Sequence, residues 1–192
     1  EGVQDIDISP DGTVLTYMSN YYDDTSAEKT VRSQVMSTPN NLSTMGSSQL
    51  TSQASDIYNY AMAVDGDGEK VYLIGDNYEQ FASFSNNGTA YRWTGSQTWT
   101  GLDLTSLPVY YPRAARFNTS GSKIWVHAYN VDRIYAFPLT DYYDVASGSS
   151  ASNAYVSTAG TLLDGLDSFD IGDNDSKFFF LTGGVLYTAA LS

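Results

Sequence analysis

One pattern recurs four times along this chain of 192 residues, and it limits the folds that the chain can adopt. Each copy contains an apolar stretch, a short polar turn and a second apolar stretch. The turns align at Gly12, Gly68, Gly121 and Asp175, which lie 53 to 56 residues apart. A repeat of this length predicts an array of similar units. A strand–turn–strand unit at this period favours a β-propeller.

Each copy predicts two strands joined by a tight hairpin. The Asp-Gly and Ser-Gly pairs in the turns supply the positive φ angles that hairpin turns require. The second strand is apolar at successive positions, as in residues 71–74 and 124–126. Such a strand needs cover on both faces. A propeller blade has that cover because it is sandwiched between two other blades.

Further strands complete each unit. We expect a third strand at residues 31–36, 90–93, 133–137 and 185–191, and a weaker fourth at 49–51, 101–104 and 154–157. The 16 Tyr, 8 Phe and 3 Trp suit pleated strands. The predicted fold class is all-β: a β-propeller of about four blades, each of three to four antiparallel strands, or a segment of a larger propeller. It forms a single domain, 1–192, with repeat units at about 1–55, 56–109, 110–163 and 164–192.

Strand counting also predicts an open edge. The chain begins almost at once with its first strand and ends with the third strand of its last unit. No spare strand is then left to cover residues 185–191, and unpaired strand edges recruit further strands. We therefore expect the ends of the chain to be engaged by other polypeptide, in an oligomer or as part of a larger chain.

Two kinds of motif carry a family resemblance. The stretches at residues 9–17 and 67–72 resemble the hairpins of propellers in the YVTN and WD40-like group. The linkers at 36–44 and 138–146 resemble those in repeats of bacterial surface proteins and marine phage virion proteins. The Trp-Asp pair of that linker is missing from every copy, and the linker at 94–98 is degenerate. The resemblance implies binding or structural work and carries over no catalytic residue.

Charge and cysteine content exclude several functions. The formal net charge of −13 repels a phosphate backbone, so we expect no nucleic-acid partner. No apolar stretch reaches the length of a transmembrane helix, so we expect no membrane insertion. The absence of cysteine removes disulfides, thiolate nucleophiles and Cys-ligated zinc.

The acidic turns offer weak calcium candidates at Asp65, Asp67, Asp173 and Asp175, since calcium prefers clustered oxygen ligands. No copy has the downstream bidentate Glu of a calcium loop. Turn formation is the preferred interpretation, and we expect no metal and no cofactor. His127 is the only histidine. With no second catalytic element beside it, we expect a hydrogen-bonded structural role.

Aromatic residues near the strand ends are the candidate binding residues. Large rings with few rotatable bonds suit protein or glycan contacts. Packing between blades is an equally good interpretation. The candidates are Tyr21, Tyr22, Trp93, Trp99, Tyr110, Tyr111, Tyr142 and Tyr143.

These observations favour a non-enzymatic structural or binding module of a virion or cell surface, such as a phage tail-fibre or capsid-decoration propeller. The expected partners are other protein subunits of an assembly and surface glycan, and the expected location is a virion or the extracellular surface. Two alternatives stay open. One is a propeller hydrolase or lactonase with a metal in the central channel, and the other is an intracellular WD40-like scaffold.

Overall fold

The computed structural model describes residues 2–20, 30–47, 49–53, 58–76, 80–86, 88–94, 97–99, 102, 104, 112–131, 133–149, 153–155, 166–172 and 175–190. Strands dominate these residues, and the helices among them are three short 3₁₀ turns, η1 (Leu42–Thr44), η2 (Tyr129–Val131) and η3 (Val145–Ser147). In this described part of the chain, no helix is long and apolar enough to span a membrane. The prediction of an all-β fold is confirmed.

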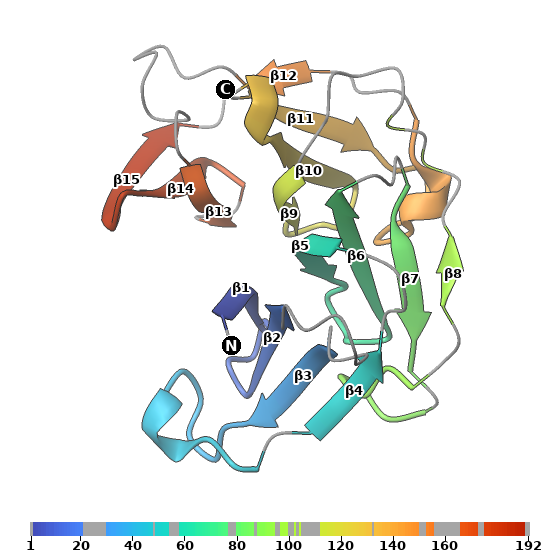
Figure 1. Cartoon of the computed structure of the whole chain (residues 1–192), viewed down its shortest axis with the longest axis vertical. Coiled ribbons are helices and arrows are strands. Elements are labelled where there is room, and N and C mark those ends of the chain that lie inside the picture. Colours follow the sequence, from blue (N-terminus) through green and yellow to red (C-terminus); the bar gives the residue numbers. More distant parts are fainter. Residues whose placement is uncertain are drawn as a thin grey trace.

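The strands form four antiparallel sheets, which we call blades 1 to 4 in chain order (Figure 1). Blade 1 contains β1 (Gly2–Ile8), β2 (Val14–Asn20), β3 (Thr30–Val35) and β4 (Gln49–Gln53). Blade 2 contains β5 (Tyr58–Val64), β6 (Lys70–Asp76), β7 (Ala82–Ser85) and β8 (Thr98–Trp99). Blade 3 contains β9 (Pro112–Phe117), β10 (Lys123–Ala128), β11 (Arg133–Pro138) and β12 (Asn153–Tyr155). Blade 4 contains β13 (Leu166–Gly172), β14 (Lys177–Thr182) and β15 (Val185–Ala190).

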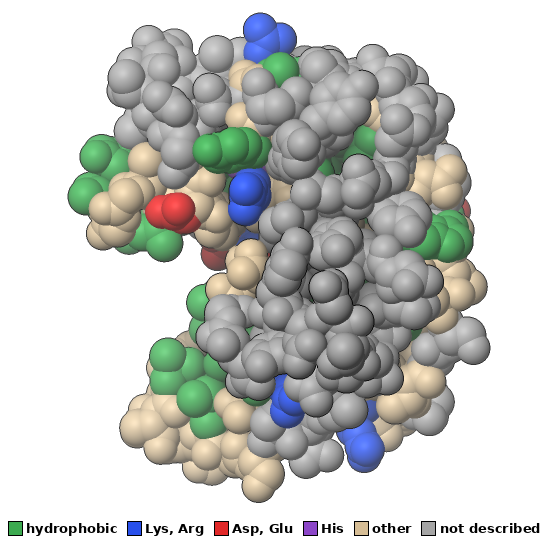
Figure 2. Space-filling view, in the orientation of Figure 1, with side chains coloured by type: hydrophobic (Ala, Val, Ile, Leu, Met, Phe, Trp, Pro, Cys, Tyr) green, Lys and Arg blue, Asp and Glu red, His purple; other side chains and the backbone are tan. Residues whose placement is uncertain are grey.

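The first strand of each blade lies innermost. β1 packs beside β5, β5 beside β9, and β9 beside β13, so the blades follow one another around a common axis (Figure 1). Figure 1 shows β1 and β13 separated at the two ends of this row, and Figure 2 shows a notch there, edged by hydrophobic side chains. The fold is an open arc of four propeller blades.

The hairpin turns have the conformation that the sequence predicted. Gly12, Gly68 and Gly121 have φ angles of 71°, 73° and 70°, and Asp175 has 63°. A residue that follows the third strand then covers the turn. In blade 3, the Tyr143 N–H donates to the Gly121 carbonyl oxygen at 2.8 Å, and the Tyr143 ring lies against the Gly121 Cα. The same arrangement recurs in blades 1 and 2, so each glycine is required by both its φ angle and its neighbour.

Blade 2 differs from the prediction. Its third strand is β7, whereas residues 90–93 form a turn in which Tyr91 has a φ of 59°. Its fourth strand is β8 rather than residues 101–104. Leu102 and Leu104 are instead buried in the core between blades 2 and 3, and Trp93 is fully buried between blades 1 and 2. Burial of large apolar side chains outweighs strand propensity at these positions.

Apolar side chains fill the interface between each pair of successive blades. Met18 and Val31 of blade 1 pack against Met62, Val71 and Leu73 of blade 2. The interfaces between blades 2 and 3 and between blades 3 and 4 hold two further cores of the same kind. Contacts between neighbouring blades therefore add to the stability of each blade, as in other repeat proteins.

Substituting Gly121 tests how the turns are held. In Gly121→Ala, the new Cβ meets the Tyr143 ring at a positive φ, so we expect a loss of about 2–4 kcal/mol in the free energy of unfolding. Gly183→Ala is the matched control, because its φ is 55° and no atom lies within 4 Å of the added Cβ. It should cost only about 1 kcal/mol. Urea unfolding compares the two variants, and equal losses would contradict the role of Tyr143.

Candidate functional site

A charged residue recurs at one position of the inner strands. Strand pairing gives Asp7, Ala63, Arg116 and Asp170 equivalent positions in β1, β5, β9 and β13. Because the inner strands surround the axis, three charged side chains from three different blades gather there. Asp7, Arg116 and Asp170 all line the same pocket.

Arg116 connects three blades at the axis. Its Nη2 donates to Asp5 Oδ1 at 2.6 Å and its Nη1 donates to Asp5 Oδ2 at 3.0 Å, which makes a bidentate pair. The guanidinium also donates to the carbonyl oxygens of Ile6, Met62 and Ala115 at 2.7–2.9 Å. Asp5 Oδ2 accepts a further bond from the Met62 N–H at 2.8 Å. Both side chains are almost fully buried, and hydrogen bonds from three blades satisfy the pair.

Asp170 extends this network to blade 4. Its Oδ1 lies 3.8 Å from Arg116 Nε, and its side chain is 72% exposed. Burial alone lowers the pKa of Arg116, but the carboxylates of Asp5, Asp7 and Asp170 raise it. The net effect is a pKa above the usual arginine value, so the guanidinium stays charged at every physiological pH.

A cavity of about 590 Å³ lies at the hairpin end of the axis. The carboxyl groups of Asp7, Asp65, Asp67 and Asp170 line it together with Arg116. Asp5 already matches the charge of Arg116, so the remaining lining is net acidic. Such a pocket suits a ligand that is rich in hydroxyl groups or positively charged.

Two carboxyl groups of the pocket titrate near neutral pH. Burial raises the pKa of Asp7 to about 6, against the opposing charge of Arg116. Burial also raises the pKa of Asp65 to about 6, although its Oδ2 accepts a hydrogen bond from the Lys70 N–H at 2.7 Å. Asp65 Oδ1 is buried and has no hydrogen-bond partner among the described residues. A pKa near 6 is typical of a general acid or base.

Two tyrosines form fixed walls of the pocket. The Tyr143 hydroxyl donates to the Thr119 carbonyl oxygen at 2.6 Å, and the Tyr143 ring packs edge-on against Phe117 with centroids 5.3 Å apart. The Tyr91 hydroxyl donates to the Gly66 carbonyl oxygen at 3.4 Å. Burial raises the pKa of Tyr91 to about 12 and raises that of Tyr143 as well, so both remain neutral phenols at physiological pH.

The acidic turn residues that were candidates for calcium binding lie at the pocket or bond to protein groups. Asp65 and the exposed Asp67 lie at the pocket. The Asp175 carboxylate accepts from the Thr119 N–H at 2.7 Å and from Asn118 Nδ2 at 3.1 Å, which links blade 4 to blade 3. Asp173 lies outside the described residues. Within the described ranges, no group of three or more His, Cys, Asp or Glu side chains is placed to hold a metal ion.

The predicted aromatic candidates divide between core and surface. Trp93 is fully buried in the interface between blades 1 and 2, so its place among the binding candidates is corrected in favour of the packing interpretation. Tyr142 and Trp99 are exposed, at 72% and 44%, and Tyr143 lines the pocket. The candidates outside the described residues are Tyr21, Tyr22, Tyr110 and Tyr111.

His127 is fully buried in β10, at the end of the strand away from the hairpin. Neither ring nitrogen has a hydrogen-bond partner among the described residues. The hydrogen-bonded structural role predicted from the sequence is therefore corrected, because no described residue bonds to the ring nitrogens of this buried histidine. Burial lowers its pKa to about 4, and the charge of Arg113 acts in the same direction. The imidazole is neutral at physiological pH.

Sequence reasoning missed Arg116, Asp5, Asp7 and Asp170 as site residues. They belong to different repeats, and Arg116 and Asp5 are 111 residues apart. One signal was available, because an alignment of the repeats places Arg116 where blade 2 has Ala63 and the other two units have Asp. A charge at a repeat position close to the axis has few partners other than the equivalent residues of other blades.

Comparisons with known proteins bear on the fold. No family model matches the chain. No curated protein matches its sequence. Among solved structures, a gluconolactonase from Xanthomonas campestris has a TM-score of 0.61 at 13% identity, with 99% of this chain and 57% of that chain covered. The calcium-binding protein regucalcin from Agrobacterium tumefaciens has a TM-score of 0.61 at 12% identity, with 93% of this chain and 52% of that chain covered. A luciferin-regenerating enzyme has a TM-score of 0.59 at 12% identity, with 95% of this chain and 54% of that chain covered.

These likenesses show a β-propeller fold, and the chain spans little more than half the length of each neighbour. They also overturn one prediction. The absence of a catalytic motif led us to expect no enzymatic activity, yet two of the neighbours are named enzymes. The exclusion of enzymes is therefore wrong, because catalytic groups in this fold can come from separate blades and leave no local motif. At these identities the comparison shows the fold alone and assigns no activity.

The buried pair can be tested by removing its cation. Arg116→Met leaves the Asp5 carboxylate buried without a counter-charge, so we expect a loss of about 3–5 kcal/mol in the free energy of unfolding. The double variant Asp5→Leu/Arg116→Met should recover much of this loss, since no unpaired charge remains. Arg133→Met, at an exposed position, should change stability by less than about 0.5 kcal/mol. Urea unfolding at pH 7 measures all three, and a small effect of Arg116→Met would contradict the central role of the pair.

His127 predicts a specific dependence of stability on pH. The unfolded chain protonates His127 near pH 6.5, but the folded chain does so only near pH 4. The stabilisation is therefore complete above about pH 6.5 and is lost as the pH falls toward 4. The raised pKa values of Asp7 and Asp65 act in the opposite direction. For this reason we subtract the unfolding free energy of His127→Leu from that of the wild type at each pH. This difference should decrease as the pH is lowered from 6.5 to 4. A constant difference would rule out the shift.

Proposed function

We propose that the protein binds a small polar molecule in the axial pocket and hydrolyses an ester or lactone bond in it, with Asp7 as the general base. The observation that carries this proposal is the pKa of Asp7, which burial raises to about 6 beside the charged guanidinium of Arg116. A general base is most effective when its pKa lies near the working pH. The presence of a gluconolactonase among proteins of similar fold supports this reaction class.

The reaction needs only water as a second reactant. The Asp7 carboxylate accepts a proton from a water molecule whose oxygen forms a bond to the carbonyl carbon. Negative charge develops on the carbonyl oxygen. The N–H groups of Arg116 are bonded to Asp5 and to backbone carbonyl oxygens, so its positive charge stabilises this oxygen through space rather than by a direct hydrogen bond. The bond from this carbon to the leaving oxygen then breaks, and the proton held by Asp7 passes to that oxygen. The products are a carboxylic acid and a hydroxyl group, which remain in one molecule when the substrate is a lactone.

The rest of the pocket favours a substrate rich in hydroxyl groups. Asp67 and Asp170 are acceptors for such groups, and their charge disfavours an anionic substrate. The rings of Tyr91 and Tyr143 offer apolar faces against which C–H groups can pack. A small sugar lactone or a polyhydroxylated ester combines these features.

The test is hydrolysis of a panel of small lactones and esters. We expect Asp7→Asn to lower kcat/KM by about 10²–10⁴-fold, the range associated with loss of a general base. In the wild type, kcat/KM should rise with pH and level off above about 6, because only the ionised Asp7 accepts a proton. Asp141→Asn, an exposed position outside the pocket, is the control and should leave kcat/KM unchanged. No turnover across the panel, or turnover that survives Asp7→Asn, would contradict the proposal.

A second candidate is a binding module of a larger assembly on a virion or cell surface. The observation in its favour is the exposure of two aromatic side chains outside the pocket, Tyr142 at 72% and Trp99 at 44%. Exposed rings of this kind suit glycan or protein contacts. Binding to an array of immobilised glycans should weaken in Tyr142→Ser if this surface is used, whereas the location on a virion or cell stays a prediction.

A further inference from the structure

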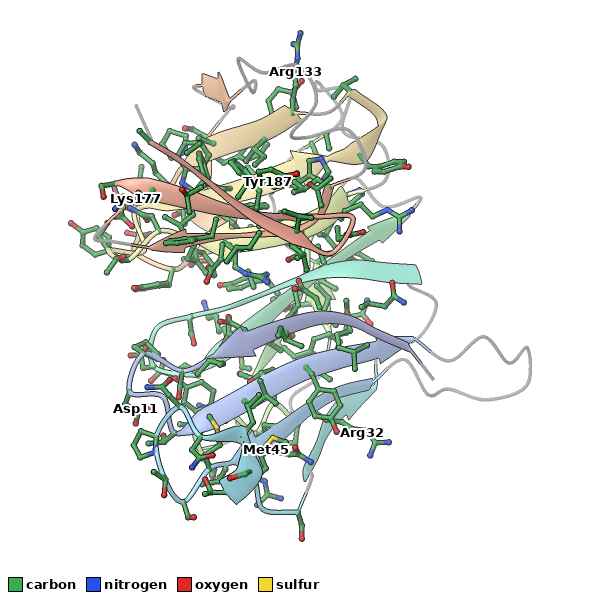
Figure 3. The ribbon with its side chains drawn as sticks, turned by 90° about the vertical axis from the view of Figure 1, so that its left-hand side faces the viewer. Asp11, Arg32, Met45, Arg133, Lys177 and Tyr187 are labelled. Atoms are coloured by element: carbon green, nitrogen blue, oxygen red, sulfur yellow. The ribbon has the colours of Figure 1, made fainter. Side chains whose placement is uncertain are left out.

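Among the four described blades, two faces have no neighbouring blade. We call the face of a blade that points toward the preceding blade its leading face, and the opposite face its trailing face. Three interfaces inside the arc each join one trailing face to one leading face. The leading face of blade 1 and the trailing face of blade 4 border the notch (Figures 1 and 2). Figure 3 views this open side, with blade 4 and its Lys177 and Tyr187 above blade 1 and its Asp11 and Arg32.

The leading face of blade 1 has the chemistry of an interior interface. Strand pairing makes Ile6 equivalent to Met62, Ala115 and Phe169 in the other blades. Those three residues are 0–2% exposed, because each packs against the preceding blade. Ile6 is 51% exposed. Ile8 on the same face is 40% exposed, so blade 1 presents two large apolar side chains to solvent on this face.

The trailing face of blade 4 also exposes apolar side chains. Phe179 occupies the position that Trp125 fills in blade 3, where the ring is buried against blade 4. Beyond Phe179 on this face, Leu181 pairs with Leu186 of β15, and these two side chains are 40% and 66% exposed. Terminal repeats that end an array normally carry a polar outer face. Blades 1 and 4 carry apolar outer faces instead.

We propose that these two faces are docking surfaces for further antiparallel blades of the same kind, which fill the notch and close the ring. The leading face of blade 1 would receive a trailing face, and the trailing face of blade 4 would receive a leading face. The comparison structures support a gap of more than one blade, because 43–48% of each neighbour's chain lies beyond the part matched by this arc. The contact differs from the strand-edge pairing that the sequence predicted at residues 185–191, since it uses the faces of the sheets.

Single cysteines test whether the two faces are free in the chain of 192 residues, which has no cysteine of its own. Ile6→Cys and Leu181→Cys report on the two faces. Val35→Cys is the control, because Val35 is 60% exposed and lies on the trailing face of blade 1, which faces blade 2. All three should react with a maleimide at rates within about threefold of one another, as expected for exposed thiols. Protection of Ile6→Cys in a monomer would overturn the proposal, and protection in a dimer detected by sedimentation would assign the face to a second copy instead.

A supplied pair of blades tests docking directly. The probe is the full chain with a second copy of residues 58–155, blades 2 and 3, joined after residue 192. The leading face of the added blade 2 fits blade 4, and the trailing face of the added blade 3 fits blade 1. We expect the labelling rates of Ile6→Cys and Leu181→Cys to fall by about tenfold or more, while Val35→Cys keeps its rate. Unchanged rates would overturn the proposal, and an extension that stays unfolded by circular dichroism counts against it, because free docking faces would order blades of this kind.

Discussion

The bidentate pair between Arg116 and Asp5 holds the centre of the arc together. One guanidinium bonds to a carboxylate of blade 1 and to backbone carbonyl oxygens of blades 1, 2 and 3, where the inner strands converge. A buried ion pair adds little net stability compared with apolar packing. Its value here is positional, because it fixes three strands that are far apart in sequence at one point. The pocket exists because these strands meet there.

The same local chemistry that builds each hairpin also builds the pocket. A positive φ at Gly68 and Gly121 turns the chain between the first two strands of a blade. Tyr91 and Tyr143 then cover these glycines and place their rings at the mouth of the axis. Burial by these turns and by the inner strands raises the pKa values of Asp7 and Asp65. The electrostatics of the site therefore follow from the repeat, although no single repeat contains the site.

Local features were predictable from the sequence, and features that depend on several blades were not. The four turn positions, the strands around them and the two similar linkers follow from short-range rules, and Asn41 and Asp144 cap equivalent 3₁₀ turns as the likeness of the linkers suggests. The third strand of blade 2 was misplaced because residues 90–93 are rich in aromatics, whereas β7 is short and half polar. Arg116 and Asp5 escaped notice because their pairing depends on how blades 1 and 3 meet. His127 looked like a satisfied core residue because an apolar strand predicts burial, whereas it does not show whether a described residue bonds to the ring nitrogens.

The open side of the arc bears on the electrostatics of the pocket. Asp170 lines the pocket and is 72% exposed, whereas Arg116 and Asp5 beside it on the axis are almost fully buried. A blade placed against blade 4 would remove water from this carboxylate and strengthen its attraction to Arg116, since Coulomb interactions grow as the local dielectric constant falls. Arg116 would then be shared between Asp5 and Asp170 more evenly, and its influence on Asp7 would change. If further blades dock as proposed, the charge balance around Arg116 would therefore depend on the occupancy of the end faces.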